Sequence, residues 1–355
     1  MAEPFRQIDT GLREGRANIA FDAALIDLHA AGEIPDTIRF LQFRPTALVG
    51  RHQAIGRELK FDVCRERGVS IGRRITGGGA IYFDEGMLGW EVVLSRKRLP
   101  MPSLADYTAS LCSAVADGLS RAFDITARFR PRNDIEVEGR KLSGTGGFFD
   151  GDTLFFQGTV LIDADPGSVM ACLNVPRAKT VRHALDRPES RITTLKALLG
   201  AAPDADEVKA AVADGLHRSL RRELIPQAPT GLEEAQAREL FDDEIGQDAF
   251  VYEIDAPGGD THLEGEVVTP GGTVTAFLRV EGEGSARRIG EALVTGDFFI
   301  TPPRVVMDLE AALRGCPVAD AARTVEAFVA KASFDLLTIA PSDFVAAIDR
   351  ALAKA

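Results

Sequence analysis

The chain has few cysteines, little aromatic content and no recognisable export segment. Its 355 residues include four cysteines, one tryptophan and three tyrosines. The cysteines, Cys64, Cys112, Cys172 and Cys316, show no Cys-x-x-Cys spacing, so they predict neither a zinc cluster nor a disulfide framework. The N-terminal residues are charged and lack the apolar core of a signal peptide. We therefore expect reduced thiols and a cytoplasmic location.

Long apolar runs and an excess of positive charge are also absent. No stretch approaches the ~18 apolar residues of a membrane span, so no membrane partner is expected. Lysine and arginine number 41 against 53 acidic residues, a formal net charge of −12. That balance argues against a nucleic-acid partner, which favours a basic surface. It leaves open a small anionic ligand in a locally basic pocket.

The length and the hydrophobic pattern predict two domains of the α+β class. The first contains strands in hairpin-like groups, which favours a mixed sheet flanked by helices over a doubly wound fold. Residues 225–231 contain two prolines and a glycine and predict a linker, followed by a bridging helix. The expected units are a large domain at 1–224, a linker with bridging helix at 225–248, and a small α+β domain at 249–355. The small domain is expected to begin with a strand at 250–254.

Three consecutive glycines, Gly77, Gly78 and Gly79, follow Arg73 and Arg74 between two expected strands. Glycine adopts positive φ and lets backbone N–H groups approach a ligand closely. Arginine offers permanently charged donors suited to phosphate or carboxylate. No Gly-Lys-Ser/Thr follows and no helix begins there, which excludes a Walker loop and a dinucleotide fingerprint. The pattern indicates an anion site at a strand–loop–strand corner, although alone it is also typical of a plain turn.

Two further segments combine polar residues with expected strands. Asn133 and Asp134 open one strand, and Lys141 begins the returning strand after a Glu-Gly turn. Such a lysine is usually solvated, but one directed into the cleft beside the glycine loop could bind a phosphate or acyl oxygen as charge develops. The third segment is a Gln157-Gly158-Thr159 interruption in an apolar strand.

Together these segments resemble the lipoate–protein ligase family, within the biotin and lipoyl ligase fold. Residues 49–53 are similar to the family's Ile-Gly-Arg-x-Gln, and residues 73–82 match its Arg-Arg-x-Ser/Thr-Gly-Gly-Gly-Ala-Val-Tyr/Phe signature. Residues 132–134, 139–144 and 158–159 follow in family order. The resemblance covers roughly residues 8–222. Residues 294–299 resemble the family's accessory domain, which is fused or separate in that family and is needed for its activation step.

The resemblance implies a two-step reaction. Lipoate attacks the α-phosphate of ATP to give lipoyl-AMP and pyrophosphate, and a lysine of a lipoyl-domain carrier protein then takes the lipoyl group. ATP and Mg²⁺ are the implied cofactors, and lipoate or octanoate is the implied substrate. Lys141 is the implied catalytic residue, and Asp134 is a candidate metal ligand. The implied nucleotide and adenylate site comprises Arg74, Thr76, Gly77, Gly78, Gly79, Asn133, Asp134, Gly158 and Thr159.

Alternating apolar positions on two strands predict a slot for the acyl chain. Ile81 and Phe83 lie on one strand, and Leu88 and Trp90 lie on the next. Core packing explains these four side chains equally well. The chain also departs from the family pattern, because Phe83 and Met87 stand where His and Asn are common, and Phe156-Gln157 stands where His-His is usual.

Two alternative functions remain open. An octanoyl- or lipoyl-transferase of the same fold would take its acyl group from a thioester and would need a nucleophilic cysteine in the cleft. None of the four cysteines lies just ahead of Asn133 or in the Gln157 strand, and Cys64 and Cys112 are expected on helices far from the motifs. A non-catalytic lipoate-binding relative is the second alternative, against which the retained Arg74 and Lys141 argue.

Overall fold

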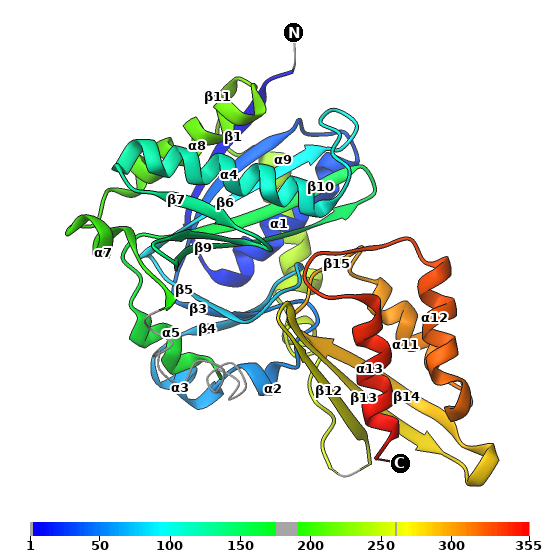
Figure 1. Cartoon of the computed structure of the whole chain (residues 1–355). Coiled ribbons are helices and arrows are strands. Elements are labelled where there is room, and N and C mark those ends of the chain that lie inside the picture. Colours follow the sequence, from blue (N-terminus) through cyan, green and yellow to red (C-terminus); the bar gives the residue numbers. More distant parts are fainter. Residues whose placement is uncertain (1–2, 175–190, 260, 355) are drawn as a thin grey trace.

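The computed structural model describes residues 3–174, 191–259 and 261–354, and it divides into a large and a small domain (Figure 1). The large domain is built on an eight-stranded sheet of order β11-β1-β2-β6-β10-β9-β8-β7. Strands β11, β1 and β2 run parallel, and the remaining neighbours are antiparallel. The strands are β1 (Phe5–Arg13), β2 (Thr37–Phe43), β6 (Met87–Ser95), β7 (Ala127–Arg130), β8 (Asp134–Val137), β9 (Arg140–Asp150), β10 (Thr153–Leu161) and β11 (Leu224–Pro226).

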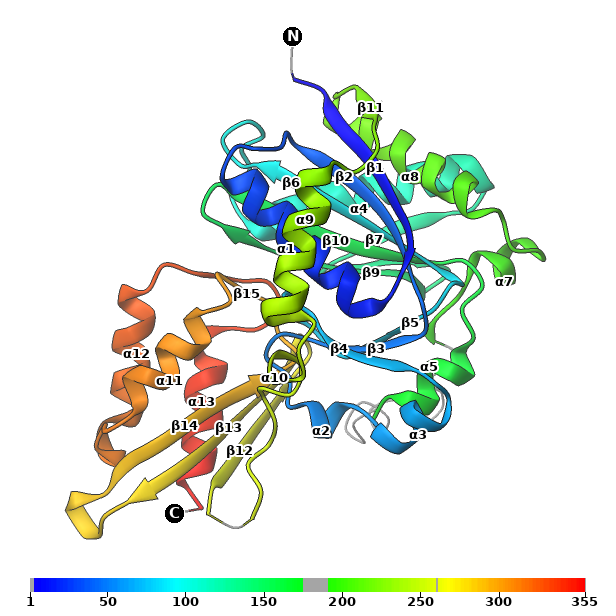
Figure 2. The ribbon, with the colours of Figure 1, turned by 180° about the vertical axis from the view of Figure 1, so that it is seen from behind.

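Two pairs of helices cover the faces of this sheet. Helices α1 (Gly15–Ala30) and α9 (Gly231–Leu240) pack together on one face, and α4 (Leu104–Phe123) and α8 (Ala205–Leu220) pack together on the other (Figures 1 and 2). Helix α4 begins after Ser103, whose hydroxyl caps the helix by accepting a hydrogen bond from the Asp106 N–H. None of the helices in the described ranges is long and apolar enough to cross a membrane.

A second, three-stranded sheet of order β4-β3-β5 carries the glycine loop. Strand β4 (Ser70–Arg73) leads into the loop, β5 (Ile81–Phe83) leaves it, and β3 (Thr46–Val49) lies between them. Both ends of the loop are therefore hydrogen-bonded to one central strand. Short helices flank this layer and the segments around it: α2 (Ile55–Glu58), α3 (Phe61–Glu66), α5 (Pro166–Cys172) and α7 (Leu195–Leu199).

The segment predicted as linker and bridging helix packs onto the large domain. Glu233 of α9 forms a bidentate ion pair with Arg6 of β1, and both side chains are almost fully buried. After α9 come a π-helical turn (Phe241–Ile245) and α10 (Asp248–Val251). Ile245, Phe250 and Val251 belong to the large domain's hydrophobic core. The strand predicted at 250–254 is wrong, because this segment begins with α10 and its apolar residues face that core.

The small domain has the predicted α+β architecture and a hydrophobic core of its own. An antiparallel sheet of order β12-β13-β14 is covered on one side by three helices (Figure 1). The α+β class expected from the sequence is confirmed for both domains. The elements are β12 (Leu263–Thr269), β13 (Gly272–Glu281), β14 (Arg288–Gly296), α11 (Val305–Leu313), α12 (Ala321–Lys331), α13 (Pro341–Leu352), a β15–β16 pair (Ile300–Thr301 and Asp335–Leu336) and 3-10 turns at Gly284–Ala286 and Val318–Asp320.

Candidate active site between the glycine loop and strand β9

Arg74 braces the glycine loop from inside. Its guanidinium donates to the carbonyl oxygens of Leu48 at 3.2 Å, Gly77 at 3.1 Å and Gly79 at 2.8 Å. Burial lowers the pKa of Arg74 to about 10, so the side chain stays charged at neutral pH. The sequence suggested that Arg74 meets a phosphate, but the structure commits this side chain to carbonyl groups of its own loop and of β3. Its charge therefore shapes the loop rather than facing a ligand directly.

Arg73 connects the loop to the segment that leads to the small domain. Its guanidinium donates to the carbonyls of Gly50 and Gln53 at 3.1 and 2.9 Å. It also donates to the carbonyls of Val251 and Ile254 at 3.1 and 2.9 Å. Burial lowers the pKa of Arg73 to about 10 despite the nearby Glu253 carboxylate. A single buried cation thus holds residues 251–254 against the large domain.

Lys141 is paired with Asp134 on the neighbouring strand. Lys141 Nζ lies 2.8 Å from Asp134 Oδ1, and Asp134 Oδ2 bonds to Arg130. A β-bulge between β8 and β9 sets Lys141 opposite Glu136 and so fixes its position along the strand. Burial raises the pKa of Asp134, but Lys141 and Arg130 outweigh it, so the net pKa is lowered. The Lys141 side chain remains 37% exposed, so a ligand can reach its ammonium group.

Asn133 and Arg132 shape the turn that precedes β8. The Asn133 amide donates to the Thr145 carbonyl at 2.7 Å, and the Asn133 carbonyl accepts from the Thr145 N–H at 2.8 Å. Arg132 adopts a φ of 102°, which is unusual for a residue with a side chain, and its guanidinium bonds to the Pro270 carbonyl of the small domain. Asn133 therefore positions Asp134 through the backbone, and Arg132 joins this turn to the small domain.

The residues that the structure describes do not assemble a metal centre. Within the described ranges, no group of three or more His, Cys, Asp or Glu side chains is close enough to hold an ion. Asp134, the predicted metal ligand, already has a cation on each carboxylate oxygen. Its environment therefore fits an ion pair rather than metal coordination, and no step of the chemistry is routed through a protein-bound metal.

Gln157 is a site residue whose role the sequence did not reveal. Its side-chain amide donates to the Thr76 hydroxyl at 2.7 Å, which ties β10 to the start of the glycine loop. Thr76 is completely buried. The only signal in the sequence was that Gln157 departs from the family's His. The structure shows that a polar contact to the loop exists despite this change.

The four residues predicted to line an acyl slot lie in two separate places. Trp90 lies opposite Gly158 in the β6–β10 pair, where a Cβ on Gly158 would come within 2.4 Å of the indole ring. Neighbouring strand residues face opposite sides, so Trp90 and Leu88 point away from the Gln157 side that meets the glycine loop. Both side chains are fully buried in the core, and Phe83 stacks on Phe43 with ring centroids 4.3 Å apart. Of the four predicted residues, only Ile81 is partly exposed.

Gly158 and Thr159 also have structural roles here. Gly158 leaves space for the Trp90 indole. The Thr159 hydroxyl accepts a hydrogen bond from the Gly144 N–H at 3.3 Å, next to the Lys141 side chain. Thr159 therefore lies close to Lys141, whereas Gly158 serves the opposite face of the sheet.

The small domain contacts the glycine loop directly. The Gly78 N–H donates to the Phe298 carbonyl at 3.0 Å, so this predicted anion donor is already used. His52 stacks on the Phe298 ring at 5.3 Å. Burial, with the charges of Arg51 and Arg73, lowers the pKa of His52 to about 3, so the ring is neutral at physiological pH. The contact between the two domains at this point is thus insensitive to pH near neutrality.

The four cysteines are all buried. Cys112 is closer to the site than the sequence suggested, because its Sγ lies 3.3 Å from the Thr145 hydroxyl, which in turn bonds to the Asn133 carbonyl. Burial raises the pKa of Cys112 to about 12. Burial and the neighbouring Cys172 raise the pKa of Cys64 to about 12 as well. Neither thiol is therefore a thiolate at neutral pH.

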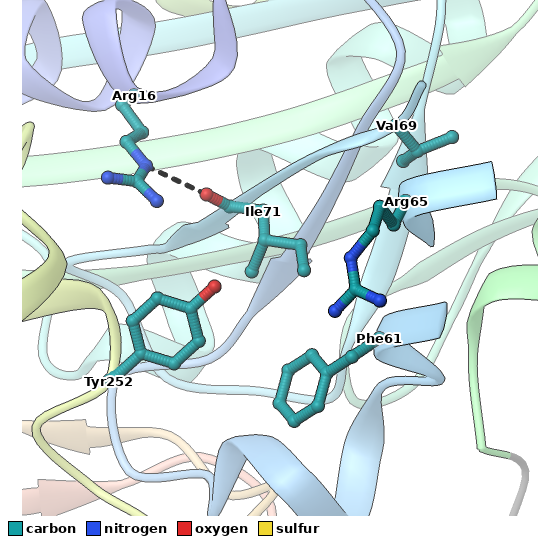
Figure 3. A pocket seen from close by; sticks show the side chains of 6 residues that line it. All are labelled: Arg16, Phe61, Arg65, Val69, Ile71 and Tyr252. Carbon is teal, nitrogen blue, oxygen red and sulfur yellow. Dashed lines mark hydrogen bonds between the residues drawn. The ribbon is translucent and has the colours of Figure 1, made fainter. Parts of the chain in front are cut away.

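A separate cavity of about 440 Å³ lies beside strand β4, at the edge of the β4-β3-β5 sheet (Figure 3). At its edge, Arg16 donates to the carbonyls of Ile71 and Gly246, each at 2.8 Å. None of the predicted site residues lines this cavity. Its lining comprises Arg16, Phe61, Arg65, Val69, Ile71 and Tyr252.

Comparison with known proteins assigns the family. Residues 14–217 match the lipoyl protein ligase A/B catalytic domain. The chain belongs to this family. Its members include both lipoate ligases and octanoyltransferases. Membership therefore shows that the chain belongs with the lipoylation enzymes, but it does not identify the acyl donor.

Three similar proteins illustrate this range. Octanoyltransferase LipM of Kyrpidia tusciae is 29% identical over 264 residues, which cover 67% of this chain and 95% of that protein. The probable lipoate-protein ligase A of Mycoplasma pneumoniae is 28% identical over 51% of this chain and 52% of that protein. The crystal structure of P. falciparum LipL1 in complex with lipoate has a TM-score of 0.73 over 94% of this chain and 95% of that chain, at 16% identity. That last likeness concerns the fold alone.

Proposed function

We propose that this protein is an ATP-dependent lipoate–protein ligase. It activates lipoate or octanoate as the acyl-adenylate and transfers the acyl group to a lysine of a lipoyl-domain carrier protein. The observation that carries the proposal is the pairing of Lys141 with Asp134 at 2.8 Å near the braced glycine loop, while the nearby Cys112 thiol stays protonated. A fixed, accessible cation suits a reaction in which negative oxygen atoms approach one another.

Negatively charged oxygen atoms approach Lys141 in both steps of the proposed reaction. In activation, the acid's carboxylate oxygen bonds to the α-phosphorus of ATP, and pyrophosphate leaves. In transfer, the carrier lysine's amine bonds to the acyl carbon, AMP leaves with the bonding electron pair, and the amine loses a proton. Lys141 stabilises the acyl and phosphate oxygens in both steps. We assign Thr76, Gly77 and Gly79 of the loop and Thr159 of β10 to the same site. Mg²⁺ would accompany the ATP phosphates rather than a cluster of protein carboxylates.

The small domain also supports a ligase. The match to the K. tusciae octanoyltransferase covers 95% of that protein but only 67% of this chain. That relative is therefore too short to contain a counterpart of the small domain in addition to the matched part. The P. falciparum fold covers 94% of this chain. An additional domain is consistent with an additional activation step, as the family resemblance implies.

The decisive test compares two acyl donors. The protein is incubated with candidate lipoyl domains and either ATP plus lipoate or octanoate, or an octanoyl thioester of an acyl carrier protein. Mass spectrometry of the domains and pyrophosphate release are measured. Modification with ATP and free acid is expected. Modification from the thioester alone would identify a transferase, and neither activity with ligand binding retained would identify a binding protein.

Thioester transfer is the second candidate because Cys112 lies next to the Asn133 turn. A transferase would need this thiol as a thiolate, which its raised pKa opposes. Cys112→Ser should leave ATP-dependent lipoylation within about twofold of the unmodified protein, since the serine hydroxyl can keep the hydrogen bond to the Thr145 hydroxyl. Loss of thioester transfer in the same variant would instead assign Cys112 as the nucleophile.

A further inference from the structure

One short segment of the small domain lies along the two catalytic motifs of the large domain. We call residues 296–301 the docking segment. At its start the Gly296 N–H donates to the His52 carbonyl at 3.0 Å, and at its centre the Phe298 carbonyl accepts from the Gly78 N–H at 3.0 Å. At its end the Thr301 hydroxyl accepts from the Phe149 N–H at 2.6 Å. The segment therefore spans from the glycine loop to β9.

Phe299 fills the gap between these motifs. A Cβ on Gly78 would lie 2.5 Å from Phe299 Cζ, and a Cβ on Gly146 would lie 2.1 Å from Phe299 Cε1. The ring is only 8% exposed. Gly78 belongs to the glycine loop and Gly146 to β9, so one side chain from the small domain rests on both. The two glycines have no side chain where this ring needs space.

The Phe299 ring lies near Lys141, the proposed catalytic residue. The Lys141 ammonium group lies against Gly144 of β9, and the Phe299 ring lies against Gly146, two residues further along the same strand. Two strand residues span about 7 Å, so the ring contacts β9 about 7 Å from the lysine's contact. Gly146 also pairs with Gln157, the residue that bonds to Thr76 of the loop. Phe299 thus packs at the place where the loop, β9 and β10 meet.

We propose that Phe299 is a positioning residue for the activation step, through which the small domain holds the glycine loop at a fixed distance from β9 and Lys141. The proposal rests on the ATP-dependent ligase function. Three successive glycines have many accessible backbone conformations, so each contact to the loop helps to keep one, in addition to the bonds from Arg74 and Gln157. The docking segment supplies such contacts with one hydrogen bond and one aromatic ring. A preformed acyl-adenylate can order the loop by its own contacts, so transfer depends less on Phe299.

The first test uses the full chain with Phe299→Ala and Phe299→Leu. Activation is measured as pyrophosphate release from ATP with octanoate or lipoate, and transfer is measured from preformed acyl-adenylate to a lipoyl domain. Phe299→Ala should lower kcat/KM for activation by about tenfold to a hundredfold, as expected for a misplaced reacting group, and leave transfer within about twofold. Phe299→Leu should recover most of the loss. Activation that is unchanged or faster in Phe299→Ala would overturn the proposal.

A second test probes the same contact from the other side. Gly146 has no positive φ, and the three atoms nearest to an added Cβ all belong to the Phe299 ring. Gly146→Ala should therefore displace the ring and impair activation, whereas adding it to Phe299→Ala should cause no further loss. Additive losses in the double variant would show that Gly146 acts on something other than Phe299 and would contradict the proposal.

Two controls separate the possible failures. Met307→Ala changes an exposed apolar side chain of the same domain and should leave both half-reactions unchanged. Thermal unfolding of each variant checks that the fold is intact. If the unmodified protein releases no pyrophosphate with either acid, the ligase function itself fails. If it is active and Phe299→Ala equals it, only the positioning role of Phe299 is refuted.

Discussion

Lys141 and Asp134 form an ion pair across two neighbouring strands, with 2.8 Å between the ammonium nitrogen and Oδ1. Asp134 is also bonded to Arg130 and is nearly buried, whereas Lys141 stays partly exposed. The carboxylate therefore holds the lysine in one orientation without burying it fully. A lysine after a hairpin turn is usually a mobile, solvated side chain. The ion pair with Asp134 gives Lys141 the fixed position that an active-site residue needs.

Replacing Lys141 should abolish lipoyl transfer. Lys141→Ala removes the cation that stabilises the developing negative charge, and losses of about a hundredfold or more are typical for such groups. Lys141→Arg is the matched control, because it keeps the charge but changes the geometry, and it should retain part of the activity. The measurement is lipoyl-domain modification by mass spectrometry. More than a tenth of the original activity in Lys141→Ala would refute the assigned role.

The hydrogen bond between Gln157 and Thr76 should matter mainly for activation. Gln157→Ala leaves the buried Thr76 hydroxyl with one partner fewer and loosens the start of the glycine loop, so we expect about a tenfold lower rate of pyrophosphate release. Gln157→His can still donate to this hydroxyl and should recover activity. A double-mutant cycle with Thr76→Ala checks the pair, since contacting residues couple measurably. Strictly additive effects would exclude a shared role.

Removing the small domain should impair activation while sparing transfer from preformed lipoyl-adenylate. The cut is best placed after Pro257, because Phe250 and Val251 belong to the large domain's core and Arg73 binds the carbonyls of Val251 and Ile254. A cut at 245 should instead destabilise the large domain. Unfolding midpoints of both shortened chains test this difference. Equal loss of activation and transfer in a folded chain ending at 257 would contradict an activation role for the small domain.

Glu310 should make the stability of the small domain pH-dependent. This nearly buried carboxyl accepts a hydrogen bond from the Val294 N–H at 2.8 Å, and burial raises its pKa to about 7. Between about pH 4.5 and 7 the folded state binds more protons than the unfolded state, so stability falls as pH rises, by an amount on the order of 3 kcal/mol.

The matched variants are Glu310→Gln and, as a control, Glu326→Gln on the exposed face of α12. Glu310→Gln keeps an acceptor without the charge, so it should stabilise the domain at pH 8 and have little effect below pH 4.5. Chemical denaturation across this range gives the free energy of unfolding. A difference between Glu310→Gln and the unmodified chain that does not change with pH would rule out the raised pKa.

The strongly patterned elements were predictable from the sequence, whereas weakly patterned ones were missed. Helix α4 has a long amphipathic pattern, and strands β6 and β10 are long and mostly apolar, so the local pattern is enough to indicate them. Strand β11 has only three residues, and β1 mixes buried and exposed positions without regular alternation, so neither could be identified. Both depend on pairing with distant strands, and local sequence does not contain that information.

The sequence by itself determined the family, the α+β class and the motifs that form the site, since turn glycines, charged pairs and hydrophobic periodicity are local properties. Only the tertiary structure decided what each motif residue does. Arg74 binds carbonyls of its own loop, Trp90 faces the opposite side of the sheet, and Phe299 reaches the glycine loop from a separate domain. The physical reason is that a side chain's role depends on which distant groups surround it, and those neighbours are set by strand register and domain packing.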